Sequence, residues 1–136
     1  MKNVTYIILA VSILSLISCD NSGEDLRKYY KNQNHSAELK GWWKRIDREP
    51  EHGFASKILF DNYKAIFHSY NIHTGIYNSS YNYWYNDDTK IYFLTEPDGI
   101  SKPDERSDNY ILNNTNDTLT IYAEYPPYIF VKYTGI

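Results

Sequence analysis

The sequence predicts an all-β fold, a small antiparallel barrel of eight strands connected up and down. The chain of 136 residues is rich in aromatic side chains, with 15 Tyr, 5 Phe and 3 Trp, and these suit a pleated, half-buried surface. Short runs of Tyr, Ile, Phe and Trp alternate with turn-forming residues across residues 38–136, as in antiparallel sheets. Residues 38–136, about 100 residues, correspond in length to a single domain.

The expected strands are separated by clear turn signals. Asn and Asp occupy residues 86–88 and most of residues 114–117, and Pro126 and Pro127 precede the last strand; these residue types favour turns. Eight short sequential strands can close into a barrel without exposed edges, so we favour a barrel over the alternative, a two-sheet β-sandwich. The expected strands cover residues 41–47, 57–60, 64–70, 79–85, 90–95, 108–113, 118–123 and 128–134.

Alternation within the strands predicts which side chains point inward, because successive side chains in a strand face opposite sides. In the first strand, however, Trp43 shares its face with Arg45, whereas Trp42 shares the other face with Ile46. The pattern therefore leaves open which Trp is buried. In the later strands the apolar sets expected to face inward are Ile91 and Phe93, then Leu119, Ile121 and Ala123, then Ile129, Val131 and Tyr133.

The N-terminal residues have the features of a signal for export. Lys2 precedes an uncharged, apolar run over residues 4–17, which is shorter than the roughly 20 residues of a membrane-spanning helix and typical of a signal peptide. The next residues, Leu-Ile-Ser-Cys at 16–19, resemble the lipobox of bacterial lipoproteins. The resemblance implies cleavage before Cys19, lipid on its thiol and acylation of the new amine. Cys19 is the single cysteine, so no internal disulfide is expected.

The expected organisation is a signal peptide over residues 1–18, a lipidated Cys19 with a flexible tether to residue 37, and a barrel domain over residues 38–136. Residues 20–37 are mostly polar, so we expect no more than one helical turn there, around residues 25–31. Asp20 directly after the Cys is an inner-membrane signal by the enterobacterial rule. Acidic residues soon after the Cys also resemble the surface-export signal of Bacteroidetes, whose composition this chain resembles, so we expect the outer membrane.

The start of the barrel domain resembles the first strand of lipocalins. Residues 39–44 read Leu-Lys-Gly-Trp-Trp-Lys, which contains the lipocalin pattern Gly-x-Trp. The domain is therefore similar to small lipocalin-like lipoproteins of Bacteroidetes. The resemblance implies that a Trp closes one end of the barrel and that a basic residue of the last strand stacks on it. Here Trp42 and Trp43 are the candidates, and Lys132 is the available base.

The sequence indicates no catalytic residues, no metal site and no cofactor, so we do not expect an enzyme. His68 and His73 would lie on opposite faces of a strand, and we expect His35 and His52 in solvent. The acidic residues of 96–105 lack the order of a calcium-binding EF-hand. A net charge of −3 without a basic cluster argues against a nucleic-acid partner.

Three tyrosines of one expected strand are the candidate ligand-binding residues. Tyr81, Tyr83 and Tyr85 share one face, where their rings could stack on a sugar or an apolar ligand. Ordinary cross-strand packing is the favoured explanation of the same pattern.

Two functions are favoured from the sequence, and a third, an enzyme on a lipocalin-like barrel, is the least favoured because no nucleophile–base or metal constellation is found. One is a lipid-anchored, non-catalytic barrel that binds a small apolar ligand inside or a protein partner at its rim. The other is an envelope inhibitor or immunity-type protein. A cavity inside the barrel would favour the ligand-binding function, whereas a filled core with an exposed patch would favour the inhibitor.

Overall fold

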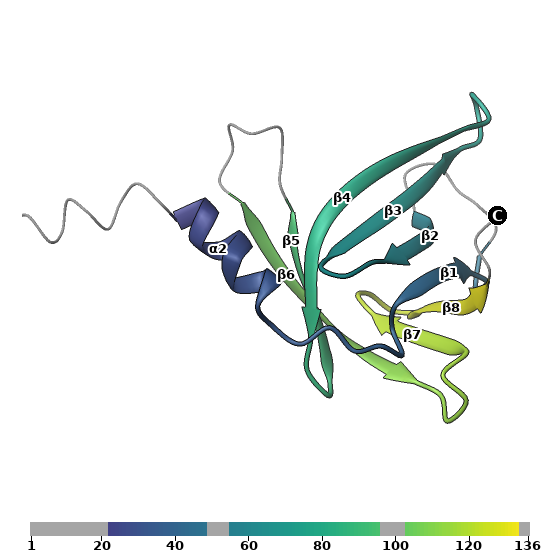
Figure 1. Ribbon diagram of the computed structural model, residues 1–136. Helices are drawn as coiled ribbons and strands as arrows, with labels where there is room; N and C mark the ends of the chain where they lie inside the picture. Colours follow the sequence, from purple (N-terminus) through teal and green to yellow (C-terminus); the bar gives the residue numbers. More distant parts are fainter. Residues whose placement is uncertain (1–21, 49–54, 96–102, 134–136) are drawn as a thin grey trace, which may run out of the picture.

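The computed structural model describes residues 22–48, 55–95 and 103–133, and there the chain forms a closed antiparallel barrel (Figure 1). Each strand pairs with the next along the chain, and β1 pairs with β8 to close the ring. The predicted up-and-down barrel is confirmed, and the alternative sandwich is wrong. The strands are β1 (Gly41–Arg45), β2 (Ala55–Phe60), β3 (Lys64–Asn71), β4 (Ile76–Asn86), β5 (Lys90–Thr95), β6 (Asp104–Leu112), β7 (Thr118–Tyr122) and β8 (Tyr128–Tyr133).

The two ends of the barrel differ. We call the end where β1 and β5 begin the closed end, and the end where β5 stops and β6 begins the open end. Large buried side chains fill the barrel toward the closed end, where Trp43, Trp84 and Leu119 are fully buried together with Leu39, which lies just before β1. The core is thus asymmetric, and the open end is less filled.

The inward set of β8 differs from the expectation. Phe130 is 1% exposed, whereas Ile129 and Val131 are only partly buried. Phe130 pairs with the buried Leu119, and directly paired residues share a face. Both faces of this strand are apolar, so alternation alone could not choose between them. The inward faces expected for β5 and β7 are correct for Ile91, Phe93, Leu119 and Ile121, which are all buried. Ala123, also expected inward, lies just beyond the end of β7, where it is exposed and lines the cavity.

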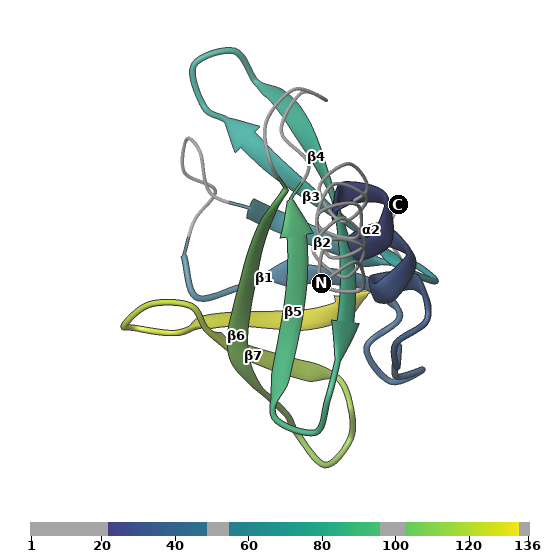
Figure 2. The ribbon, with the colours of Figure 1, turned by 90° about the vertical axis from the view of Figure 1, so that its left-hand side faces the viewer.

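The expectation of a flexible tether is wrong for residues 22–37. Helix α2 (Ser22–Lys31) lies along the outer wall of the barrel (Figure 2). Tyr30 is 1% exposed, with its ring centroid 4.8 Å from that of Tyr85, and its hydroxyl donates to Glu105 Oε1 at 3.1 Å. Burial and the nearby Glu105 carboxylate raise the pKa of Tyr30 well above its usual value, so the phenol stays a donor.

The segment after α2 crosses the closed end of the barrel. The backbone N–H of Ser36 donates to Asn86 Oδ1 at 2.9 Å, and Leu39 is completely buried. His35, expected in solvent, places Nε2 2.7 Å from the carbonyl oxygen of Trp84. Burial lowers the pKa of His35. We call residues 32–40 the plug, because their polar groups bond to the barrel and the side chain of Leu39 enters the core.

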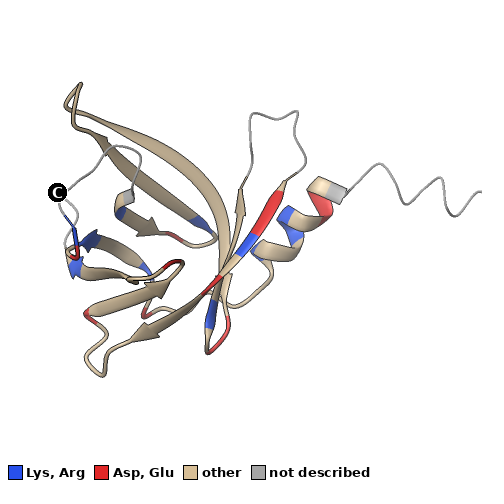
Figure 3. Cartoon of the chain, turned by 180° about the vertical axis from the view of Figure 1, so that it is seen from behind, with Lys and Arg blue, Asp and Glu red and all other residues tan. Residues whose placement is uncertain are grey.

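The β3–β4 hairpin is longer than expected and extends beyond its neighbours at the open end. β4 begins at Ile76, three residues before the predicted start, and pairs with β3 up to Asn71. The early part of β4 is exposed on both faces, and its residues 76–80, Ile-Tyr-Asn-Ser-Ser, do not alternate between apolar and polar side chains. No Asp, Glu, Lys or Arg occurs in residues 65–86, and the projecting hairpin is accordingly free of charge in Figure 3.

Candidate functional site

A cavity of about 430 Å³ lies inside the barrel and opens at the open end. Its volume falls within the roughly 300–1,000 Å³ typical of small-molecule sites. One part of its wall is apolar, formed by Ile58, Phe67, Phe93, Ile121 and Phe130. The rest is polar and is formed mainly by Ser69, Ser80, Asn82, Thr95, Arg106 and Asp108. The cavity therefore suits a ligand with an apolar body and a polar group.

Asp108 is the most unusual group in this wall. Its side chain is 8% exposed, and Arg106 Nε lies 3.2 Å from Oδ2 as an ion pair. Nevertheless, Oδ2 accepts no hydrogen bond from the described residues. Burying a carboxylate oxygen without a directed donor is costly. A ligand that brings an N–H or O–H donor to this oxygen would remove that cost.

Arg106 sits at the border between the polar and apolar walls. Its guanidinium carbon lies 5.2 Å from the centroid of Phe93, a cation–π contact, while its side chain remains 58% exposed. β6 begins at Asp104, four residues before the expected start, and this extension carries Arg106 to the cavity. Residues 104–107 are all polar, so no apolar alternation predicted this extension of the strand.

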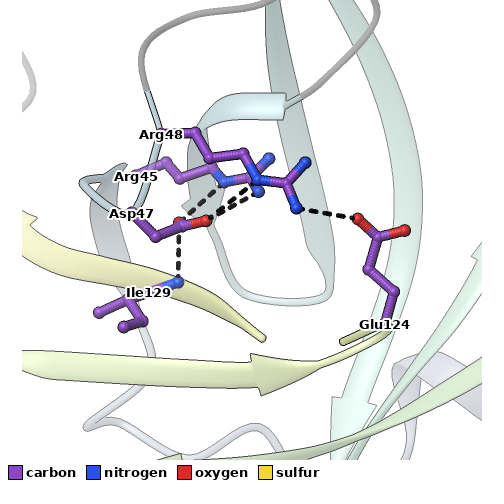
Figure 4. Close-up of polar contacts among 5 residues, drawn as sticks. All are labelled: Arg45, Asp47, Arg48, Glu124 and Ile129. Carbon is purple, nitrogen blue, oxygen red and sulfur yellow. Dashed lines mark hydrogen bonds and ion pairs between the residues drawn. The ribbon is translucent and has the colours of Figure 1, made fainter. Parts of the chain in front are cut away.

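An ion-pair cluster braces the cavity wall from the end of β1 (Figure 4). Arg45 is buried and donates from Nε and one terminal nitrogen to the two oxygens of Asp47, each at 2.9 Å. Asp47 Oδ1 also accepts the backbone N–H of Ile129 at 2.9 Å. Burial alone would raise the pKa of Asp47, but these donors outweigh it and hold the pKa below its usual value.

The same cluster fixes an aromatic ring that lines the cavity. The guanidinium carbon of Arg45 lies 3.9 Å from the centroid of Tyr128, which belongs to the cavity wall. Arg48 reaches Glu124 at 3.7 Å on the outside of the cluster. The sequence did contain the signal for this arrangement, because Trp43, Arg45 and Asp47 share one face of the first strand.

The structure places Trp43 inside and Trp42 outside. Trp43 Nε1 donates to the carbonyl oxygen of Leu39 at 2.7 Å. Lys132 Nζ lies 5.2 Å from the Trp43 ring and 2.8 Å from the carbonyl oxygen of Glu38, so a base of the last strand does stack on this Trp at the closed end. Trp42 instead packs on the outer wall, 5.1 Å from the ring of His68.

The candidate tyrosine platform is divided among different environments. None of its three members lines the described cavity. Tyr85 stacks on Tyr92, with centroids 4.4 Å apart, and forms part of the surface that receives α2. Tyr83 stacks on Tyr63 at 5.8 Å, and Tyr81 is 60% exposed. This row mainly supports cross-strand and helix packing, which was the favoured explanation.

The histidines and acids do not converge. No group of three metal-ligating side chains occurs within residues 22–48, 55–95 and 103–133. His68 Nδ1 lies 3.1 Å from Ser79 Oγ on the outer wall, and Glu105 is bonded to the Tyr30 hydroxyl. Residues 96–102, like His52 and Cys19, lie outside the described residues.

None of the described helices is long and apolar enough to span a bilayer. Comparison with protein-family models and with curated proteins gives no match. Among solved structures, the chain is similar to the crystal structure of an uncharacterized protein from Bacteroides eggerthii. That comparison has 18% sequence identity and a TM-score of 0.48, and it covers 69% of this chain and 98% of the other.

Proposed function

We propose that this protein is a lipid-anchored envelope protein whose barrel binds a small amphipathic ligand without catalysing a reaction. The observation that carries the proposal is the cavity of about 430 Å³ inside the barrel. A filled barrel would have favoured a purely surface-binding protein. The lipocalin-like pattern of residues 41–43 and the stacking of Lys132 on Trp43 support the same function.

The wall of the cavity defines the chemistry of the ligand. Phe67, Phe93 and Phe130 offer an apolar surface, and Asp108 Oδ2 offers a buried acceptor that lacks a donor. An apolar body with an amine or another strong donor would satisfy both parts. A carboxylate-bearing ligand of the same size brings no donor to Asp108 Oδ2, and it would compete with Asp108 for Arg106, which is already paired with Asp108 at 3.2 Å.

Binding can be measured with the neutral fluorophore N-phenyl-1-naphthylamine and residues 20–136. We expect saturable binding at one site, with a rise and blue shift in emission as the probe leaves water. Octylamine should displace the probe at several-fold lower concentration than octanoate, because only the amine can donate a hydrogen bond to Asp108 Oδ2. Equal displacement by the two would contradict the role of Asp108, and an absence of saturable binding would contradict the proposed function.

The anchor is supported by the lipobox over residues 16–19. Cys19→Ala should leave an unprocessed, unlipidated precursor, because the substituted side chain has no thiol to carry the lipid. Intact mass and detergent-phase partitioning measure both changes. Ser18→Ala is the matched control and should mature normally, since it keeps a small residue before the Cys. Normal maturation and detergent partitioning of Cys19→Ala would refute the anchor. Of the two bilayers, we propose the outer membrane.

A further inference from the structure

We infer that the open end of the barrel rests on the membrane, so that the ligand enters the cavity from the bilayer. The inference rests on the proposed lipid anchor at Cys19 and deepens the proposed function, because it makes the ligand a membrane-resident amphiphile. Two independent observations carry it: the direction in which α2 runs along the barrel, and the position of the exposed apolar side chains.

Helix α2 runs from the open end of the barrel to the closed end. Its first turn lies beside the start of β6, where a Cβ built on Gly23 would meet the ring of Pro103 at 3.6 Å. Its last residues lead into the plug at the closed end, where Ser36 bonds to Asn86 at the end of β4. The N-terminus of the helix therefore points to the side on which the cavity opens.

The lipid is attached only a few residues before this helix. Whatever its conformation, the chain from Cys19 to Ser22 spans at most about 11 Å, since an extended residue covers roughly 3.6 Å. Because Tyr30 fixes α2 to the barrel wall, this short connection cannot let the barrel turn freely above the membrane. The side of the barrel that carries the N-terminus of α2 must face the bilayer.

Exposed large apolar side chains gather at the same end. The β3–β4 hairpin presents Ile72, Ile76 and Tyr77, which are 53%, 58% and 45% exposed. The β7–β8 turn presents Tyr125, which is 96% exposed. Ile46 and Tyr122 also lie at this end, whereas Tyr29 and Ile111 lie toward the closed end and Tyr81 lies midway along β4. Six of the nine exposed large hydrophobic residues that the structure describes are therefore at the open end.

The composition of the hairpin suits the membrane interface. Residues 65–86 contain no Asp, Glu, Lys or Arg, so the hairpin itself carries none of these charges into the headgroup region. Lys57 Nζ of β2 lies 5.1 Å from the Tyr77 ring, and a cation at this position suits the headgroup phosphates. Tyr70 and Tyr77 form a cross-strand pair with ring centroids 5.0 Å apart. Tyrosine is enriched at membrane interfaces, where its ring is apolar and its hydroxyl remains wet.

A lipid bilayer explains both observations better than a protein partner does. A protein could cover the apolar rim, but it would not account for an anchor whose chain leaves the barrel on the same side. With the open end on the bilayer, an amphiphile could pass from the membrane into the cavity, its apolar body against the Phe wall and its donor group at Asp108.

Site-specific fluorescence on the full lipidated chain tests this orientation. In the proposed mature protein the thiol of Cys19, the single cysteine, is blocked by lipid. A thiol-reactive nitrobenzoxadiazole label therefore modifies only a cysteine that is introduced elsewhere. We choose Ile72→Cys and Tyr125→Cys at the open end. Ile111→Cys toward the closed end is the matched control, because Ile111 is 57% exposed and Ile72 is 53% exposed. Each protein is bound to vesicles of phosphatidylethanolamine and phosphatidylglycerol that contain nitroxide-labelled lipid.

The label at positions 72 and 125 should shift to the blue and be quenched several-fold more than the label at position 111. Flotation with the vesicles reports the anchor separately. Protein that floats but is quenched equally at all three positions, or more at position 111, overturns the inferred orientation and leaves the anchor standing. Correctly folded protein that does not float contradicts the proposed anchor and this inference with it.

Discussion

Trp43→Ala should lower the free energy of unfolding by about 3–5 kcal/mol, the usual cost of removing a fully buried large aromatic ring. The indole is 0% exposed, donates to Leu39 and supports the stacked Lys132. Its loss would leave a cavity at the closed end and would detach the plug from the core. Urea denaturation of residues 20–136, followed by circular dichroism, measures the change.

The adjacent Trp provides the control. Trp42→Ala removes the same side chain from the outer wall, where Trp42 contacts His68 and Tyr133, so we expect a loss of about 1–2 kcal/mol. If Trp42→Ala destabilised the protein as much as Trp43→Ala, the assignment of Trp43 to the interior would be wrong.

Tyr30→Ala should lower the free energy of unfolding by about 2–4 kcal/mol, because it removes a buried ring and the hydrogen bond to Glu105. Tyr29→Ala, in the same helix but with a side chain 50% exposed, should change stability by less than about 1 kcal/mol. Urea unfolding of both variants gives the comparison. A flexible segment before the barrel would instead make both substitutions neutral, which would contradict the docking of α2 and the orientation inferred from it.

The barrel was predictable because its signals are local. Runs of Tyr, Ile and Phe mark β5 and β7, and Asn and Asp mark the turn after Asn86, so strand number and order could be predicted from the residues. The parity of the first strand placed Arg45 and Asp47 with Trp43. That grouping looked like a conflict, but a bidentate ion pair satisfies both charged groups inside.

The remaining features depend on contacts between distant residues. Helix α2 has few apolar residues, and the surface around Tyr85 that receives Tyr30 comes from strands far along the chain. The choice of Phe130 over Ile129 depends on register, which neither residue reveals. The sequence predicts Asp108 only as the first residue of a strand, because its carboxylate lines a cavity only once the barrel has closed.

Binding in the cavity is tested most directly by comparing Ser80→Trp with Ser79→Trp in the N-phenyl-1-naphthylamine titration. The two serines are neighbours in β4, but Ser80 lines the cavity, while Ser79 contacts His68 on the outer wall. An indole at position 80 should fill the cavity and weaken binding by more than about tenfold, or 1.4 kcal/mol. An indole at position 79 should leave binding unchanged. Equal affinity in both variants and the wild type would contradict ligand binding inside the barrel.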